Sequence, residues 1–441
     1  MKKTVVLISS VMALLLTGCT GASQMPKNNQ IAPVELNVTT TWSGTDGNSE
    51  TYQRYIDRYM KETGTVINDS SGDSDETFKK RVLMDFEVGG EPDVLFYFNG
   101  SDADTFIKAG KVVPLSTIRA EYPDFVTNLD DAAFVPSGVD GKVYAVPVYG
   151  YWEAMYVNKE VCRQAGVEPP DKDTTWEEFL QICEKIKNAG YTPIAASLAK
   201  EPHYWFEFVL YNQVAPSSHG VIPTSLDSET GQAWCRGLSD LKEMYENGYF
   251  LKNTLYTSSD ESFQSFMDGK AAFMVDGSWK LGTILQRAED PENFGVTFVP
   301  AKGERKNTDI IGGFSSGWYI TQKAWDDPEK REAAMNFITF MTSDQVVSDF
   351  ASVTLSATTL KNGTQYDASD FSTLQMEAVD MLDQKTSIVS AVQDSLSVQS
   401  RSPLFDGMSD IVTGKTEVET AMQEFLELRK AERRGEGDLA N

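Results

Sequence analysis

The sequence predicts an α/β fold divided into two lobes, and three observations support this prediction. Strand-like and helix-like patterns alternate from residue 35 onward. Several strand candidates are unbroken apolar runs, which are typical of strands covered by helices on both faces of a parallel sheet. The chain has 441 residues, more than one compact core usually holds. With 41% hydrophobic and 24% charged residues, its composition is that of a folded globular protein.

The first elements are two strands and two helices. Glu35–Thr39 alternates apolar and polar residues, as a half-buried strand does. A helix is predicted next, because apolar residues recur at helical spacing over 52–60, and Gly64 stands where a helix commonly ends. The same spacing over 78–86 predicts another helix. The apolar run 93–98 then predicts a strand buried on both faces.

The alternation continues to the end of the chain. The segment Val143–Val148 predicts a further strand. Thr175 and Glu178 form the capping-box pattern that opens a helix, which is expected to end near 188–190. The remaining predicted elements are a helix over 234–245, strands at 271–275 and 318–320, and helices over 334–341 and 418–425.

The start of the chain has the pattern of an export signal. A Lys-Lys pair precedes an apolar run over 5–16, which is too short to cross a bilayer as a helix. We interpret residues 1–18 as a secretory signal peptide. The residues Leu-Thr-Gly-Cys at 16–19 resemble a bacterial lipobox, in which the cysteine is lipidated. We therefore expect a lipid such as palmitate on Cys19, a flexible tether over 19–33, and a location at the extracellular face of the cell membrane.

Charge and cysteine content exclude several classes of protein. The formal net charge is −26, from 65 acidic and 39 basic residues, so a nucleic acid would be repelled. Besides Cys19 the chain has Cys162, Cys183 and Cys235, an odd number without the CxxC spacing of a zinc site. Cys162 and Cys183 fall on helical patterns that could be neighbours, so a disulfide between them stays an alternative, but buried free thiols are the favoured interpretation. We expect neither a metal nor a cofactor.

Catalytic patterns are weak throughout the chain. It contains two histidines, His203 and His219, and no Gly-x-Ser-x-Gly elbow accompanies either. Gly414-Lys415-Thr416 lacks the leading glycine of a phosphate-binding loop. The sequence therefore predicts a binding protein and not an enzyme. A pair of glycosidase carboxylates cannot be tested by sequence among so many acidic residues, so a cell-surface glycosidase stays the enzyme alternative.

A set of segments, in order and spacing, resembles family 1 of the bacterial extracellular solute-binding proteins, the maltose-binding-protein-like group. The resemblance covers about residues 34–430. The matching segments are Gly89–Val94, Gly110–Leu115, Asp140–Pro147, Met155–Glu160, Ala165–Val167, Pro169–Pro170, Thr175–Phe179, Gly269–Met274, Asp276–Trp279 and Ala333–Thr342.

The resemblance implies a periplasmic-binding-protein-like fold of type II, in which a hinge closes two lobes over a ligand in a central cleft. The implied lobes are residues 34–147 plus 312–355 and residues 148–311 plus 356–441. It also implies a monomer that delivers its solute to the permease subunits of an ABC importer. A sensor subunit that signals to a membrane kinase would use the same fold and stays an alternative. The chain is expected to cross between the lobes near Pro147, Ile311 and Ser356.

We expect the ligand-binding residues at the predicted carboxyl ends of strands, because the cleft of such folds is formed by the loops at these ends. Sugar sites combine aromatic faces with carboxylates, amides and arginines that make paired hydrogen bonds. In the first part of the chain the candidates are Trp42, Asp46, Tyr97, Asn99, Tyr149, Tyr151 and Trp152. Later candidates are Trp205, with its neighbours His203 and Tyr204, then Asp276, Trp279, Gly313, Phe314, Ser315 and Arg401.

The resemblance gives some of these positions a role. Trp279 matches a stacking tryptophan of the family. Tyr97 and Arg401 stand where the maltose-binding member has tryptophans, and Tyr151 stands where it has a carboxylate, so the ligand is expected to differ from maltose. We predict that the ligand is a carbohydrate, and specifically an oligosaccharide. A non-sugar solute such as a polyamine or a phosphate ester is the alternative, whereas a ferric site is disfavoured because the chain has no Tyr-Tyr pair.

Overall fold

The computed structural model describes residues 33–44, 46–363 and 368–439. The predicted signal peptide, the lipidation site Cys19 and the predicted tether up to residue 32 lie outside the described residues. In the described part of the chain, no helix is both long enough and apolar enough to cross a membrane.

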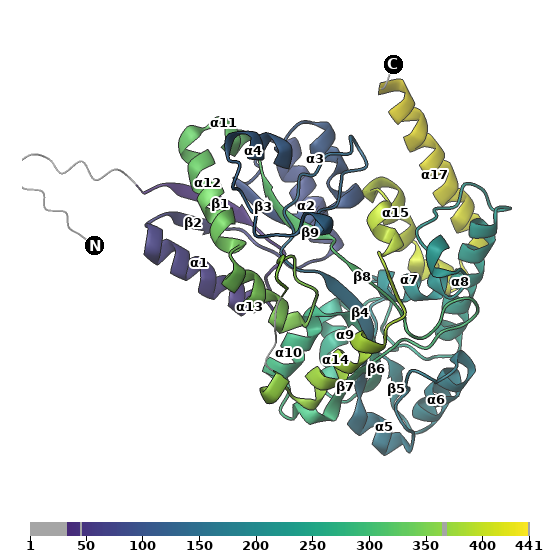
Figure 1. Ribbon diagram of the computed structural model, residues 1–441. Helices are drawn as coiled ribbons and strands as arrows, with labels where there is room; N and C mark the ends of the chain where they lie inside the picture. Colours follow the sequence, from purple (N-terminus) through teal and green to yellow (C-terminus); the bar gives the residue numbers. More distant parts are fainter. Residues whose placement is uncertain (1–32, 45, 364–367, 440–441) are drawn as a thin grey trace, which may run out of the picture. The chain divides into compact units, whose positions relative to one another are not determined.

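The first of two sheets formed by the described strands is mostly parallel (Figure 1). Its order is β2 (Val66–Asp69), β1 (Glu35–Thr39), β3 (Val94–Phe98) and β9 (Ser316–Ile320). Strand β1 runs parallel to β2 and β3, whereas β9 is antiparallel to β3. In that register Phe98 lies opposite Ser316, so the carboxyl end of β3 meets the start of β9.

Helices cover both faces of the first sheet because its strands are apolar on both sides. One hydrophobic cluster joins Val38, Phe96 and Trp318 of the strands to the first set of helices, and another contains Leu95 and Tyr319. This division follows the two-residue period of a strand. The first set is α1 (Ser49–Thr63), α4 (Leu115–Glu121), α11 (Gln322–Asp326), α12 (Pro328–Met341) and α13 (Asp344–Thr354), and the second is α2 (Glu76–Glu87) and α3 (Asp104–Lys108).

The second sheet is mixed and centres on one long strand. Its order among the described strands is β10 (Ser387–Val389), β8 (Asp309–Gly313), β4 (Tyr151–Asn158), β6 (Ala271–Gly277) and β5 (Thr192–Ile194), and β7 (Phe294–Thr297) also pairs with β4. Strand β4 is antiparallel to β6, β7 and β8. Because β8 belongs to this sheet and β9 to the first, the chain passes from one sheet to the other at residues 314–315.

Helices cover both faces of the second sheet as well. On one face, Met155 and Val157 of β4 join a cluster with α5 (Lys159–Ala165), α6 (Trp176–Asn188), α7 (His203–Tyr211), α8 (Glu229–Glu246), α15 (Val398–Asp406), α16 (Met408–Val412) and α17 (Val418–Leu439). On the other face, Ala154 and Tyr156 pack with α9 (Ser259–Met267), α10 (Trp279–Arg287) and α14 (Thr373–Gln384). Each sheet with its helices forms one lobe, so the predicted two-lobed α/β fold is confirmed.

Most of the predicted elements are confirmed, and the local signals explain why. Gly64 ends α1 in the left-handed conformation, with φ of 75°. The side chain of Thr175 accepts a hydrogen bond from the backbone N–H of Glu178 while the Glu178 carboxylate accepts one from that of Thr175, as the capping box requires. In the described structure Cys162 and Cys183 are buried free thiols, as predicted, and Cys235 is a partly exposed free thiol.

The predicted strand over Val143–Val148 is wrong. Its Val146 makes one isolated bridge, in which its N–H donates to Trp318 O at 2.9 Å and its carbonyl accepts from Trp318 N at 2.8 Å. The next residue is Pro147, which has no N–H to continue the ladder. The apolar pattern was real, since Val146 and Val148 are buried, but it belongs to a connection between the two sheets.

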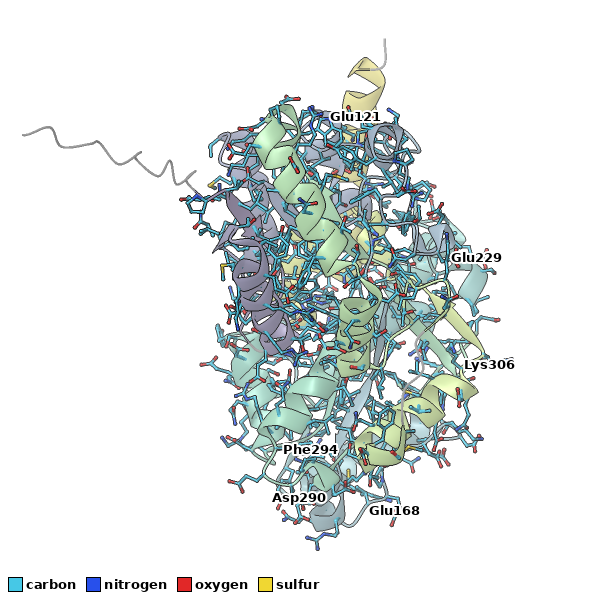
Figure 2. The ribbon with its side chains drawn as sticks, turned by 60° about the vertical axis from the view of Figure 1, so that its left-hand side comes forward. Glu121, Glu168, Glu229, Asp290, Phe294 and Lys306 are labelled. Atoms are coloured by element: carbon cyan, nitrogen blue, oxygen red, sulfur yellow. The ribbon has the colours of Figure 1, made fainter. Side chains whose placement is uncertain are left out.

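Acidic side chains are spread over the outside of the molecule. Figure 2 shows Glu121 at the end of α4, Glu168 after α5 and Glu229 at the start of α8, all of which are exposed. They come from both lobes, which agrees with the strongly negative net charge of −26.

Candidate functional site

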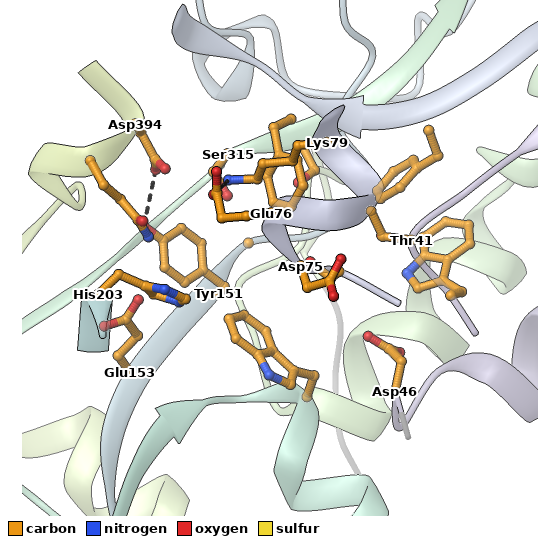
Figure 3. A pocket seen from close by; sticks show the side chains of 18 of the residues that line it. Thr41, Asp46, Asp75, Glu76, Lys79, Tyr151, Glu153, His203, Ser315 and Asp394 are labelled. Carbon is orange, nitrogen blue, oxygen red and sulfur yellow. Dashed lines mark hydrogen bonds and ion pairs between the residues drawn. The ribbon is translucent and has the colours of Figure 1, made fainter. Parts of the chain in front are cut away.

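A cavity lies between the two lobes, and its empty volume is about 890 Å³, part of which is open to solvent. The first lobe contributes residues that follow β1, residues of β3 and the start of α2, and the second contributes the start of β4, α7 and α10 (Figure 3). The lining residues are Thr41, Trp42, Asp46, Ser74, Asp75, Glu76, Lys79, Phe96, Phe98, Tyr149, Gly150, Tyr151, Glu153, His203, Tyr204, Trp279, Ser315, Ser316, Gln393 and Asp394.

A second cavity adjoins the first. It shares Asp46, Asp75, Tyr204 and Trp279 with the first cavity and has an empty volume of about 910 Å³, again partly open to solvent. Asp276, at the end of β6, lines this second cavity. The two cavities therefore form one elongated cleft in which the side chains of Trp279 and Tyr204 face both parts.

Three aromatic rings from the second lobe form a wall of this cleft. The ring centroids of Tyr151 and Trp279 are 6.2 Å apart, and those of Tyr204 and Trp279 are 6.5 Å apart. The indole N–H of Trp279 donates to Asp276 Oδ1 at 2.8 Å, which holds the ring by its edge. Because Trp279 and Tyr151 are only partly buried, part of each ring is available to stack against an apolar ligand surface.

Trp42 has a different environment on the side of the first lobe. It is 1% exposed, and its ring stacks on Phe96 with centroids 4.0 Å apart. Its indole N–H donates to the Tyr149 hydroxyl at 2.8 Å, and the Asn48 amide donates to the same hydroxyl at 3.0 Å. Trp42 thus supports the cavity wall mainly through Tyr149, with little ring surface left for a ligand.

Carboxylates dominate the polar lining of the first cavity. Among the described residues, the first cavity is lined by five carboxylates, namely Asp46, Asp75, Glu76, Glu153 and Asp394. Burial raises the pKa of Asp46 to about 7, although the backbone N–H of Asn48 and the charge of Lys280 lower it. Burial likewise raises the pKa of Asp394 to about 7. Burial, with the charges of Glu207, Asp394 and Asp276, holds the pKa of Glu153 well above its usual range.

Two acceptor atoms in the cavity lack a partner. Glu153 is 2% exposed and Gln393 is 8% exposed, and both line the first cavity. Among the described residues, neither Oε2 of Glu153 nor Oε1 of Gln393 has a hydrogen-bond partner. Buried polar atoms are nearly always paired in native proteins. These two atoms are therefore placed to accept hydrogen bonds from something that enters the cavity.

The cations beside the cavity are already paired by the protein itself. The Arg401 guanidinium lies 2.7 Å from Asp102 and 3.2 Å from Glu76, and Lys79 Nζ lies 3.2 Å from Glu76 and 3.1 Å from Asp102. Although burial raises the pKa of Glu76, the charges of Lys79 and Arg401 lower it to about 2. We call Glu76, Lys79, Asp102 and Arg401 the interlobe ion cluster, because Arg401 belongs to α15 of the second lobe and the others to the first.

The structure brings five of the predicted site residues to the first cavity, and a sixth to the second. The first cavity is lined by the predicted residues Trp42, Asp46, Tyr149, Tyr151 and Trp279. It is also lined by His203, Tyr204 and Ser315, which are neighbours of predicted residues in the sequence. Asp276 lines the second cavity. Trp205 is 2% exposed and borders only a smaller cavity, behind Tyr204.

Other candidates do not line the main cavities, for identifiable reasons. Tyr97 is fully buried against Phe78 and Phe106, because it points to the opposite face of β3 from Phe96. The Asn99 amide donates to Phe314 O at 3.1 Å, which ties together two further candidates. Trp152 is buried with its indole N–H donating to Thr354 O at 3.1 Å, Gly313 lies within β8, and Arg401 is 0% exposed in the ion cluster.

Several lining residues were missed by the sequence interpretation. Asp75, Glu76 and Lys79 stand at the start of α2, and Gln393 and Asp394 lie in a short helix, η6 (Val392–Ser395). A signal existed for the first group, because Asp75 is a helix N-cap directly after the turn that follows β2, and its carboxylate accepts from Phe78 N at 2.7 Å. No local pattern marks Gln393, Asp394 or Glu153.

A metal ion in the site would require several ligand side chains close together. No group of three or more His, Cys, Asp or Glu side chains suited to hold a metal ion occurs among the described residues. Burial lowers the pKa of His203 to about 3, so its imidazole is neutral at physiological pH.

Comparison with known proteins gives three kinds of match. Residues 54–372 match the family profile described as bacterial extracellular solute-binding protein. The chain is 23% identical over 281 residues to the sn-glycerol-3-phosphate-binding periplasmic protein of Yersinia pestis, and 24% identical over 282 residues to that of Salmonella typhimurium. Each match spans 60% of this chain and 60% of the relative's own length.

Solved structures match over nearly the whole chain. A chitin oligosaccharide binding protein superposes with a TM-score of 0.77 at 20% identity, over 90% of this chain and 98% of the other. The maltose/maltodextrin-binding domain of Bdellovibrio bacteriovorus, bound to maltotriose, has a TM-score of 0.70 at 16% identity, over 91% and 100%. A raffinose-bound solute-binding protein has a TM-score of 0.68 at 17% identity, over 90% and 98%. At these identities the likeness establishes the fold.

Proposed function

Because the chain belongs to the bacterial extracellular solute-binding protein family, we propose that it binds a carbohydrate between its two lobes and delivers it to the permease of an ABC importer. The aromatic wall of Tyr151, Trp279 and Tyr204 carries this proposal. Sugars present apolar ring faces and many hydroxyl groups, so they are bound by aromatic faces with acceptors close by. Here the partly exposed rings of Tyr151 and Trp279 stand among carboxylates that can accept hydrogen bonds from sugar hydroxyl groups.

The structural relatives support the same ligand class. Proteins of this fold are described as binding chitin oligosaccharide, maltotriose and raffinose. Because the two cavities adjoin along Trp279 and Tyr204, the cleft extends past a single binding position, so we propose an oligosaccharide. The function is binding and not catalysis, and the protein acts as a monomer at the extracellular face of the membrane, held by a lipid on Cys19.

Hinge closure accompanies binding in this proposal. The proposed bodies are residues 34–147 plus 312–355 and residues 148–311 plus 356–441, except that Gly312 and Gly313 move with the second lobe because β8 pairs with β4. The middle crossing is then at 314–315, between β8 and β9. The interlobe ion cluster joins α15 to α2 across the cleft, through Arg401 and Glu76 at 3.2 Å. Such contacts form only when the lobes are together, so they stabilise a closed state that surrounds the ligand.

The sequence relatives favour a second candidate, a phosphate ester, because they bind sn-glycerol-3-phosphate. The charge of the cavity opposes it. Among the described residues that line the first cavity, one lysine, Lys79, stands against five carboxylates, and that lysine is paired with Glu76 and Asp102. In the first cavity a dianionic phosphate would therefore meet mainly carboxylates and a lysine that is already paired.

Isothermal titration and thermal-shift measurements on residues 22–441 test the proposal. The ligands tested are oligosaccharides from chitin, xylan, maltodextrin and raffinose. Glycerol-3-phosphate, spermidine and amino acids are tested in parallel, because they represent the alternative ligand classes. A saturable rise in melting temperature with one carbohydrate class, growing with ligand concentration, is expected because the ligand binds only the folded state. Stabilisation by glycerol-3-phosphate alone would establish the second candidate, and release of reducing sugar would show a glycosidase.

A further inference from the structure

The cavity has an excess of negative charge that sugar hydroxyls do not require. The described lining residues of the first cavity include five carboxylates and one lysine, and those of the second include six carboxylates and two lysines, with Asp46 and Asp75 common to both. Neutral sugars are satisfied by amides and hydroxyls as well as by carboxylates. Burying ionised carboxylates together is costly unless a cation compensates them.

Two of these carboxylates, Glu153 and Asp394, lie at the end of the first cavity near Tyr151. Figure 3 shows Glu153, His203, Tyr151 and Asp394 on one side of the cavity, away from Thr41 and Asp46. The Tyr151 hydroxyl donates to Asp394 Oδ2 at 3.5 Å. The Glu153 side chain points into the same space, 2% exposed, with its Oε2 unpaired among the described residues.

The unpaired Gln393 Oε1 adds an acceptor of a different kind at this end. Gln393 and Asp394 are neighbours in η6, and both line the cavity. Oε1 of Gln393 has no partner among the described residues. The amide oxygen and the two carboxylates are acceptors, so the group that fits between them must be a multiple donor.

The nearest protein cations do not supply that donor. Lys79 and Arg401 are held by Asp102 and Glu76, at distances of 2.7–3.2 Å. His203 is neutral at physiological pH, because burial lowers its pKa to about 3. The raised pKa values of Glu153 and Asp394 show that burial favours their protonated forms, so a positive charge on the ligand would compensate them when they are ionised.

We propose that the ligand is a carbohydrate that carries a protonated amine, and that Glu153, Gln393 and Asp394 form the subsite for its ammonium group. An ammonium has three N–H donors and one positive charge, which matches three acceptors of which two are carboxylates. The rest of the sugar then lies along Trp279 and Tyr204. This inference rests on the proposed function, because it names the class of carbohydrate for the same cavity.

The experiment compares matched ligands that differ only in the amine. Binding of glucosamine oligomers and of N-acetylglucosamine oligomers of equal length is measured by isothermal titration, with spermidine as a third probe. We expect the free-amine oligomer to bind at least about tenfold more tightly than the acetylated one, which corresponds to about 1.4 kcal/mol. Equal or tighter binding of the acetylated or another neutral oligosaccharide would overturn the inference and leave the proposed function intact. Binding of spermidine without any carbohydrate would overturn both.

Three variants locate the subsite. Glu153→Gln and Asp394→Asn each keep the side-chain shape and remove one carboxylate, so each should abolish most of the preference for the free amine, measured as the ratio of the dissociation constants of the acetylated and free-amine oligomers. Glu168→Gln removes an exposed carboxylate outside both cavities and should leave the preference unchanged. Circular dichroism verifies that each variant is folded, and two independent subsite variants guard against the failure of one. An amine preference that survives both subsite variants would contradict the assignment of these residues.

Discussion

Arg401 and Asp102 form a buried ion pair between residues that are 299 positions apart in the chain, with Nη2 of Arg401 at 2.7 Å from Asp102 Oδ1. The side chains are 0% and 1% exposed. Arg401 also donates through Nη1 to the carbonyls of Gln393 and Leu396. The pair thus connects the first lobe to the segment that contains Gln393 and Asp394.

Removing Arg401 is predicted to leave buried carboxylates without a partner. Arg401→Met should destabilise the protein by roughly 3–5 kcal/mol, the usual cost of breaking a buried pair on one side. Urea unfolding at neutral pH measures this loss. Adding Asp102→Asn should recover part of it, because one uncompensated charge is removed.

The matched control is Arg54→Met. Arg54 pairs with Asp349 at 3.2 Å, but its side chain is 62% exposed. Exposed pairs contribute less than about 1 kcal/mol. Similar losses in the Arg54 and Arg401 variants would show that the interlobe ion cluster has no special role.

Trp279 is predicted to be the main stacking residue. Trp279→Ala should weaken carbohydrate binding by about 10- to 100-fold, or about 1.4–2.7 kcal/mol, because a large, partly exposed aromatic face is removed from the contact. Isothermal titration with the carbohydrate identified in the screen measures the change. Trp176→Phe, at the buried start of α6, serves as the control and should lower stability without changing the dissociation constant. Unchanged affinity in Trp279→Ala would mean that the aromatic wall does not contact the ligand.

Asp46 should make the stability of the ligand-free protein depend on pH. Its pKa is raised from 3.8 to about 7, mainly by burial. Between these values the folded state holds a proton that the unfolded state has lost, so the contribution of Asp46 to stability decreases as pH rises from about 4 to about 7. Below pH 4 both states are protonated, and above pH 7 the loss is complete.

Asp46→Asn removes this titration and keeps the Oδ1 acceptor that the Asn48 N–H uses at 2.7 Å. The stability of the variant relative to the wild type should therefore rise from pH 4 to pH 7 and level off above it. Melting temperatures of both proteins across pH 4–8 give this difference directly. Two parallel curves would show that Asp46 titrates normally.

Gly317 is predicted to be essential where the chain joins the lobes. A Cβ at this position would lie 2.7 Å from Val146 C and 2.9 Å from Pro147 N, which are backbone atoms that cannot move cheaply. Gly317→Ala should destabilise the protein by about 1–3 kcal/mol through overpacking. At Gly138 a Cβ would meet no atom within 4 Å, so Gly138→Ala is the control and should be neutral or slightly stabilising. Chemical denaturation of both variants makes the comparison, and equal stability would contradict the close packing of this crossing.

Local sequence patterns predicted the regular elements well because each depends on neighbours in the chain. The capping box at Thr175, the apolar stripe of α1 and the doubly buried strand β3 are all confirmed in place. The segment 143–148 failed because its burial comes from a connection between sheets and Pro147 prevents a ladder. An apolar pattern in the sequence indicates that a segment is buried. Whether the segment is a strand depends on its backbone hydrogen bonds to a neighbouring strand.

The site divides in the same way. The sequence by itself determined the family, the two-lobed α/β fold and part of the cleft, because strand ends and aromatic residues such as Tyr151 and Trp279 are visible in local patterns. Only the tertiary structure decided that Tyr97 turns into the core, that Arg401 pairs with Asp102, and that Glu153 and Gln393 keep unpaired acceptors in the cavity. The physical reason is that burial, pairing and charge compensation depend on atoms hundreds of residues away, which meet only when the lobes pack against each other.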